Sequence, residues 1–250
     1  MRHTHRAVRI YKVTIVLVVR LAVTPSTQDI ARRLPVGTCV VTDYQTAGRG
    51  RLGRRWDAPP QTALLASFVL PIRPLALFAA GVAAAEACGG GVELKWPNDL
   101  LLDDRKLGGL LAEQRRDRSI IGAGINLRWS PPGGACLRIE RDELLEQMCE
   151  RMEHWFAAPD DAVLDSWRLR AATIGRLVRI ELPGETFEGH AEGICPDGAL
   201  LVSGRRVTVG DVIHLRPPVE RPDAGAPAIS APPAPVASPR PAGRTALDRH

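Results

Sequence analysis

Several kinds of residue are scarce in this sequence, and each scarcity excludes a class of protein. The five cysteines are scattered and have no C-x-x-C spacing, so neither a disulfide framework nor a zinc site is predicted. The six histidines form no ligand cluster. The apolar run at residues 13–19 is too short to cross a bilayer, and Arg20 interrupts it. We therefore expect a cytoplasmic protein without a membrane span or a tightly bound metal.

The composition sets the scale of the fold. A chain of 250 residues with 45% hydrophobic content is long enough for one sizeable core and a small second domain. The net charge of +5 is modest and by itself suggests only acidic partners. From residue 217 onward proline and alanine dominate without an apolar period, so residues 217–250 are predicted to be a disordered tail.

Hydrophobic periodicity predicts alternating strands and helices before that tail. β-branched and apolar runs bounded by glycine and proline indicate strands, and Pro74 suits the first turn of a helix. The expected strands are residues 10–23, 38–45, 62–70, 92–95, 100–102, 106–113 and 119–127. The expected helices are residues 28–34, 75–87, 142–156 and 161–171. Short β-type runs between residues 174 and 216 predict a small barrel of four or five strands.

The most informative stretch is residues 48–56, in which three glycines alternate with four arginines before Trp56. Glycine lets the backbone approach a ligand closely, and guanidinium groups match phosphate or carboxylate oxygens. The nearest acidic residues are Asp43 and Asp57, so the positive charge of this arginine loop is uncompensated in sequence. The loop is predicted to bind an anion and to be mobile without it.

A literal G-x-G-x-x-G lies within the loop, but a dinucleotide-binding site is not predicted. That fingerprint requires a helix that opens on the last glycine. Here Pro59 and Pro60 follow shortly after, and paired prolines do not fit inside such a helix. A basic arm that binds RNA or DNA remains an alternative for the loop.

A second informative stretch follows the helix at residues 75–87. Turn-forming residues 96–99 separate two short strands, and residues 103–105 form a hairpin tip. If this hairpin closes, Lys95, Asn98, Asp99 and Lys106 lie close together. An apolar strand has little structural reason to begin with a lysine beside glycines, so Lys106 is a candidate for direct contact with a ligand.

The arginine loop, the Lys-Trp-Pro-Asn-Asp run at residues 95–99 and the Lys-Leu-Gly-Gly-Leu-Leu run at residues 106–111 occur in one order on one chain. With these three motifs the sequence resembles biotin protein ligase. The resemblance has recognisable motifs over residues 24–127 and extends loosely to residue 216. The resemblance implies an α+β fold: a mixed-sheet catalytic domain at residues 10–172, related to class II aminoacyl-tRNA synthetases, and an SH3-like barrel at residues 173–216.

The resemblance also implies the reaction and the residues that perform it. Biotin and MgATP would form biotinyl-5′-AMP, and biotin would then pass to a lysine of a biotin carboxyl carrier protein. The implied catalytic residues are Lys106, Arg51 and Asp99. The implied biotin-binding residues are Ser26, Thr27, Gln45, Arg49, Arg51, Lys106 and Gly109. The implied ATP-binding residues are Arg49, Arg51, Arg54, Trp56, Asn98 and Asn126, with Trp129 as a further cover for the ligand.

Two departures from the family pattern are visible. Many relatives have asparagine after the Ser-Thr pair, where this chain has Gln28, and this puts one biotin contact in doubt. Many others begin with a helix-turn-helix domain, for which there is no room before residue 10, so we expect a form without specific DNA binding. A homodimer is a family expectation. A lipoate or octanoate ligase shares the fold and the chemistry and stays open as an alternative.

Overall fold

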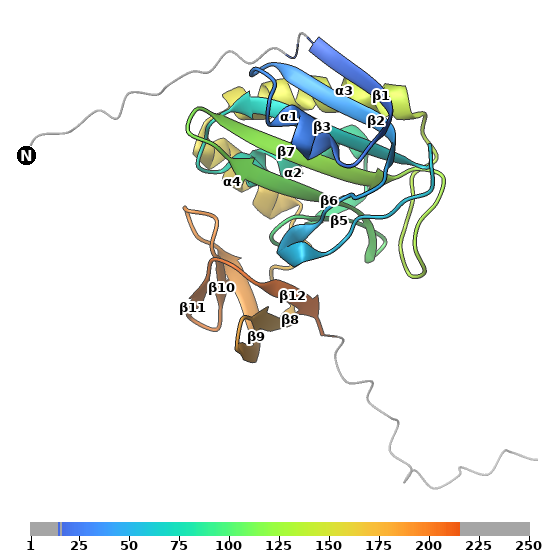
Figure 1. Cartoon of the computed structure of the whole chain (residues 1–250). Coiled ribbons are helices and arrows are strands. Elements are labelled where there is room, and N and C mark those ends of the chain that lie inside the picture. The colour runs from blue at the N-terminus through green and yellow to red at the C-terminus, as the bar shows by residue number, and fades with distance from the viewer. Residues whose placement is uncertain (1–14, 16, 216–250) are drawn as a thin grey trace, which may run out of the picture. The chain divides into compact units, whose positions relative to one another are not determined.

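A seven-stranded mixed sheet forms the larger part of the protein (Figure 1). The computed structural model describes Ile15 and residues 17–215. Only β1 and β2 pair in parallel, and every other neighbouring pair is antiparallel. The strands run across the sheet in the order β1 (Leu17–Thr24), β2 (Thr38–Gln45), β3 (Ala63–Pro71), β7 (Arg118–Asn126), β6 (Arg105–Gln114), β5 (Asp99–Leu102) and β4 (Val92–Lys95).

The central strands are buried because helices cover both faces of the sheet. Alternate residues of a strand point to opposite faces, and Cys39 and Val41 accordingly join one core cluster while Val40 joins another. The larger cluster lies between the sheet and helices α2 (Ala76–Cys88), α3 (Arg141–Ala157) and α4 (Asp160–Leu169). The smaller cluster lies under the short helix α1 (Thr27–Ala31).

The helices agree with their predicted positions to within a few residues. The apolar stripe of α3 is buried against the core. Helix α1 is shorter than expected: it ends at Ala31 rather than residue 34. The expected strand at residues 10–23 is described only in part, because residues 10–14 and 16 lie outside the described residues, as does the predicted tail at 217–250.

A second, antiparallel sheet follows α4. Its five strands match the predicted number of short β runs, and they adopt the order β11 (Arg205–Val207), β10 (Leu200–Val202), β9 (Glu185–Ile194), β8 (Leu177–Leu182) and β12 (Asp211–His214). Trp96, which precedes β5, joins the two sheets by donating its indole N–H to the Gly198 carbonyl at 2.9 Å. Within the described part of the chain, no helix has the length and apolar character needed to cross a membrane.

A hydrogen-bonded chain at the same junction ends on a half-buried histidine. The Trp96 backbone N–H donates to Thr173 Oγ1 at 3.1 Å, and Thr173 Oγ1 lies 3.1 Å from His214 Nε2. Burial, followed by the positive charges of Lys95 and Arg176, lowers the pKa of His214 to about 4.

This histidine makes folding stability depend on pH in a defined window. An unfolded histidine takes up its proton near pH 6.5, whereas the folded one does so only near its lowered pKa of about 4. The unfolded state therefore binds more protons between these values, and stability falls as pH drops through them. We expect His214→Gln to lose less stability than the native chain between pH 7 and pH 4 in urea unfolding. His190→Gln, at an exposed position, is the control, and equal slopes for all three proteins would contradict this assignment.

Candidate active site

The floor of the candidate site is a group of buried, mutually hydrogen-bonded polar side chains. Gln45 Oε1 accepts from the Thr27 backbone N–H at 2.8 Å and from Thr27 Oγ1 at 3.1 Å. Because the Thr27 hydroxyl donates to Gln45, it accepts from Ser67 Oγ at 2.7 Å. Ser26, at the N-cap of α1, is also buried. The structure thus brings together Ser26, Thr27 and Gln45 as predicted, and it adds Ser67, which the sequence analysis missed.

A cavity opens above this floor. It is bounded by the arginine loop, by α1, by the middle of β6 and β7, and by one residue of the second sheet. The lining residues are Ser26, Thr27, Gln28, Gln45, Arg49, Gly50, Arg51, Arg54, Arg55, Trp56, Ala66, Asn98, Asp99, Lys106, Gly109, Leu110, Leu111, Gly122, Ala123, Gly124 and Asp211. All but two of the predicted site residues line this cavity. The exceptions are Asn126 and Trp129.

The arginine loop has a defined conformation over the cavity. Arg49 and Arg55 form an antiparallel bridge at its base, and a short 3-10 turn, η1 (Arg51–Gly53), forms its tip. The Gly50 backbone N–H donates to the Arg54 carbonyl at 2.7 Å. Gly48 is required at the base, because a Cβ there would lie 2.3 Å from the Trp56 carbonyl oxygen.

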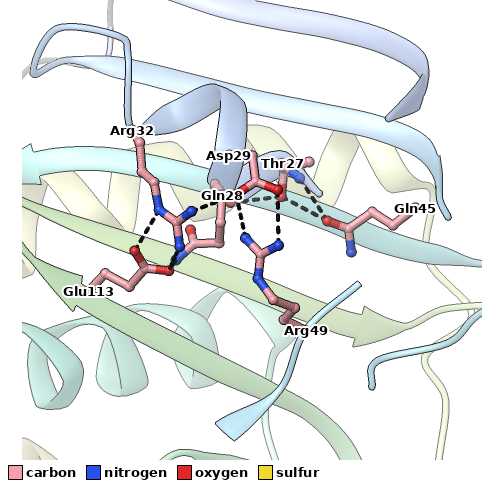
Figure 2. Close-up of polar contacts among 8 residues, drawn as sticks. Thr27, Gln28, Asp29, Arg32, Gln45, Arg49 and Glu113 are labelled. Atoms are coloured by element: carbon pink, nitrogen blue, oxygen red, sulfur yellow. Dashed lines mark hydrogen bonds and ion pairs between the residues drawn. The ribbon is translucent and has the colours of Figure 1, made fainter. Parts of the chain in front are cut away.

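Carboxylates remote in sequence compensate part of the loop's positive charge in the folded protein. Arg49 donates to Asp29 with both terminal nitrogens, at 2.9 and 2.6 Å, as the dashed lines in Figure 2 show. Arg54 pairs with Asp211 of the second sheet. These carboxylates come from α1 and β12, distant in sequence, and so the local search for acids could not find them.

Arg51 lies deeper than the other loop arginines. It donates to Asn98 Oδ1 at 2.9 Å and to the Gly210 carbonyl at 3.2 Å. Its burial lowers the pKa of its guanidinium, although an arginine remains charged at any physiological pH. Asn98 in turn donates from its amide to the Leu110 carbonyl at 2.9 Å. Arg51 is therefore a fixed positive charge at the mouth of the cavity.

The hairpin residues meet as the sequence predicted. Lys106 Nζ lies 2.7 Å from Asp99 Oδ1, and Asp99 pairs across the strands with Gly109. Lys106 is about half exposed, so its ammonium group is accessible from the cavity. Lys95 stands opposite Asp99 on β4 but does not line the cavity, and burial lowers its pKa.

Two glycines in β7 allow side chains to approach the sheet closely. A Cβ at Gly124 would lie 2.5 Å from the Trp56 ring, and one at Gly122 would lie 3.2 Å from the Gln28 amide. Trp56 Nε1 and Gln28 Oε1 are buried without a hydrogen-bond partner in the described part of the chain. A ligand that placed a hydrogen-bond acceptor beside Trp56 Nε1 and a donor beside Gln28 Oε1 would satisfy both atoms.

Two residues with predicted ligand contacts, Asn126 and Trp129, contact other parts of the protein. Asn126 is buried, and its amide donates to the Ala135 carbonyl at 3.0 Å, so it fastens the loop after β7 rather than facing the cavity. Trp129 packs with Trp56 against a small apolar cluster formed by Ala58, Ala63 and Leu65. Among the residues that the structure describes, no group of three metal-ligating side chains is present.

Comparisons with known proteins agree with this geometry. Residues 21–128 match the model of the biotin/lipoate A/B protein ligase family, and residues 173–215 match the biotin protein ligase C-terminal domain. A biotin--[acetyl-CoA-carboxylase] ligase from Mycobacterium tuberculosis is 33% identical over an alignment of 214 residues, and the match covers 72% of this chain and 80% of that protein. The chain belongs to the biotin protein ligase family.

Other members of the family support the same assignment. A biotin--[acetyl-CoA-carboxylase] ligase from Paracoccus denitrificans is 30% identical over 74% of this chain and 93% of its own length. The match to the bifunctional ligase/repressor BirA of Bacillus subtilis, at 33% identity, covers 71% of this chain and 66% of that protein. The biotin protein ligase of Aquifex aeolicus, solved with biotin and ATP, superposes with a TM-score of 0.70 at 25% identity, over 81% of this chain and 100% of that one.

The hydrogen bonds of the floor make a stability prediction with a built-in control. Thr27→Val keeps the shape of the side chain but removes an acceptor from Ser67 and a donor to Gln45, and we expect a loss of about 1–3 kcal/mol in unfolding free energy. Thr38 is equally buried, but its hydroxyl has no partner in the described part of the chain, so Thr38→Val is expected to be neutral or stabilising. Urea unfolding of both variants checks this, and equal losses would contradict the assigned hydrogen bonds.

Proposed function

We propose that this family member activates biotin with MgATP to biotinyl-5′-AMP and transfers biotin to a lysine of a biotin carboxyl carrier protein. One observation carries the proposal: a single cavity has a polar floor of Ser26, Thr27 and Gln45 and a roof of arginines. A fused ring with a ureido group needs polar partners at one end, and an acyl phosphate anhydride needs cations at the other. A pocket for an aliphatic lipoyl tail alone would not need the polar floor.

The first half-reaction requires alignment of two anions rather than a base. The biotin carboxylate is already ionised and attacks the α-phosphate, with pyrophosphate as the leaving group. Cations fixed before the reaction stabilise the charge that grows on phosphorus. We assign this role to Lys106, Arg51 and Arg54, with Mg²⁺ entering as part of the nucleotide substrate.

The second half-reaction requires a neutral amine, whereas a free lysine has a pKa of about 10.4. Asp99 is one of two carboxylates that line the cavity, and its Oδ1 lies 2.7 Å from Lys106 Nζ. We assign to Asp99 the orientation of Lys106 and the acceptance of the proton from the incoming carrier lysine. A closed arginine loop would also exclude water from the adenylate.

We assign binding of the adenine end of the nucleotide to Trp56, Asn98 and Asn126. Trp56 has an unpartnered indole N–H in the cavity wall, which supports its contact with the nucleotide. For Asn126, whose amide holds the Ala135 carbonyl, a contact would require the backbone near it or a rearranged side chain. Gly109, which lies beside Lys106 and Asp99, would line the path of the biotin tail.

Finer features of the architecture and partners belong to the same proposal. We assign the seven-stranded sheet, up to residue 172, to the class II synthetase-like type and residues 173–216 to an SH3-like barrel. A homodimer is supported by β1, an edge strand with the exposed apolar residues Leu17, Val18 and Val23. Pairing of the loop arginines with Asp29 and Asp211 weakens the alternative of a nucleic-acid-binding arm. A cytoplasmic location fits the use of ATP.

Pyrophosphate release tests the proposed activity directly. The protein is mixed with MgATP with and without biotin, and a biotin carboxyl carrier domain is then added. We expect pyrophosphate only when biotin is present, and a biotinylated carrier lysine detected by mass spectrometry. Absence of biotin-dependent turnover would overturn the proposal.

Lys106 offers a sharp variant of this test. Loss of one preorganised cation typically slows such a step by about 10²–10³-fold, and we expect this for Lys106→Gln in biotin-dependent pyrophosphate release. Arg105→Gln is the matched control, because Arg105 is the next residue on β6, is exposed, and pairs with Asp103 outside the cavity. Similar rates for the two variants would contradict the role of Lys106.

A further inference from the structure

The arginine loop is tied to α1 through a carboxylate that the proposed chemistry does not use. Asp29 follows Thr27 and Gln28 of the floor and accepts two hydrogen bonds from Arg49, at 2.9 and 2.6 Å. This is a fork-to-fork pairing, the strongest geometry that an arginine and a carboxylate adopt. Figure 2 shows the Arg49 guanidinium directed at Asp29. Arg49 thus differs from Arg51 and Arg54, which face the hairpin and the second sheet.

Asp29 is itself held in place by a second charged pair. Arg32, one turn along the chain, donates to Asp29 Oδ1 at 2.6 Å. The same guanidinium makes two bonds to Glu113 of β6, at 2.8 and 2.7 Å, and Gln28 Nε2 donates to Glu113 at 3.3 Å. The result is a chain of contacts from β6 through α1 to the loop.

The charges of this network favour its closed arrangement. The hydrogen bond from Arg49 is the largest influence that lowers the pKa of Asp29, and the hydrogen bond from Arg32 does the same for Glu113. Both carboxylates are therefore ionised at neutral pH. Asp29 and Arg49 remain 35% and 38% exposed, however, so water competes with their contact, and the pair is reversible.

From this geometry we propose that Asp29 is a positioning residue that clasps Arg49 and thereby holds the arginine loop closed over the cavity. Arg49 then acts through Asp29 and not by direct contact with the ligand carboxylate or phosphates. The inference deepens the proposed function, since the clasp would retain a biotinyl-adenylate made in the cavity. It also divides the loop: the stem at Arg49 is fastened to α1, and the tip at Arg51 and Arg54 is left to meet the ligand.

A double-mutant cycle separates the two roles of Arg49. The variants are Asp29→Asn, Arg49→Gln and the double variant, and the first readout is dissociation of biotinyl-adenylate formed in place from biotin and MgATP. If Arg49 acts through Asp29, each single variant raises the dissociation rate by about two- to fivefold, as for a partly exposed ion pair, and the double variant is no worse than either single one. For Asp29→Asn, which lies outside the cavity lining, the rate of adenylate formation at saturating substrates stays within about twofold of the native rate.

The same cycle has a readout that does not depend on the proposed chemistry. Trypsin cleavage after Arg54 and Arg55, followed by mass spectrometry on the ligand-free protein, reports opening of the loop. We expect faster cleavage in all three variants, to the same extent. Arg49→Lys retains the charge but lacks the fork and should behave as Arg49→Gln does. Asp117→Asn removes a similar Asp–Arg pair at the distant tip of the β6–β7 hairpin and should leave cleavage at the native rate.

The outcomes are distinguishable. If Arg49→Gln accelerates adenylate loss while Asp29→Asn has no effect, or if the two effects multiply in the double variant, Arg49 contacts the ligand on its own and the proposal is wrong. Unchanged cleavage in Asp29→Asn also overturns it. If the native protein makes no adenylate, the proposed function fails, and the trypsin experiment still decides whether Asp29 clasps the loop.

Discussion

The closed site depends on pairing between the arginines of one short loop and carboxylates from distant parts of the chain. Four like charges within nine residues repel one another unless counter-charges are fixed beside them. Asp29 of α1 and Asp211 of β12 supply these charges at the two ends of the loop, and Asp57 pairs with Arg55 at its exit. With the loop in this position, the polar floor and Lys106 line one cavity.

The floor and the loop are held by different kinds of interaction. This difference suits an enzyme that must both bind its ligand and release its product. The floor is built from buried, neutral hydrogen bonds between Thr27, Gln45 and Ser67, which are costly to leave unmade. The loop is held by ion pairs at the surface, which individually contribute little. A rigid floor therefore selects the ligand, while a weakly held cover opens and closes on it.

Much of this arrangement could be predicted from the sequence, since the signals were local. The order of strands and helices, the loop, and the hairpin of Asp99 and Lys106 follow from periodicity, turn residues and spacing. The partners Ser67, Asp29, Glu113 and Asp211 could not be predicted, because their contacts arise only when remote strands and helices pack. Asn126 illustrates the same limit: its position in sequence fits a ligand contact, but the loop after β7 folds back and engages its amide.

The central claim is that the polar floor selects a ureido ring over an aliphatic acyl chain. Calorimetric titration of the protein with biotin and, separately, with lipoate tests this most directly. A site built to hydrogen-bond a polar group rejects an analogue that lacks it by large factors, so we predict that biotin binds at least about a thousandfold more tightly than lipoate. Equal affinities, or tighter binding of lipoate, would contradict the account.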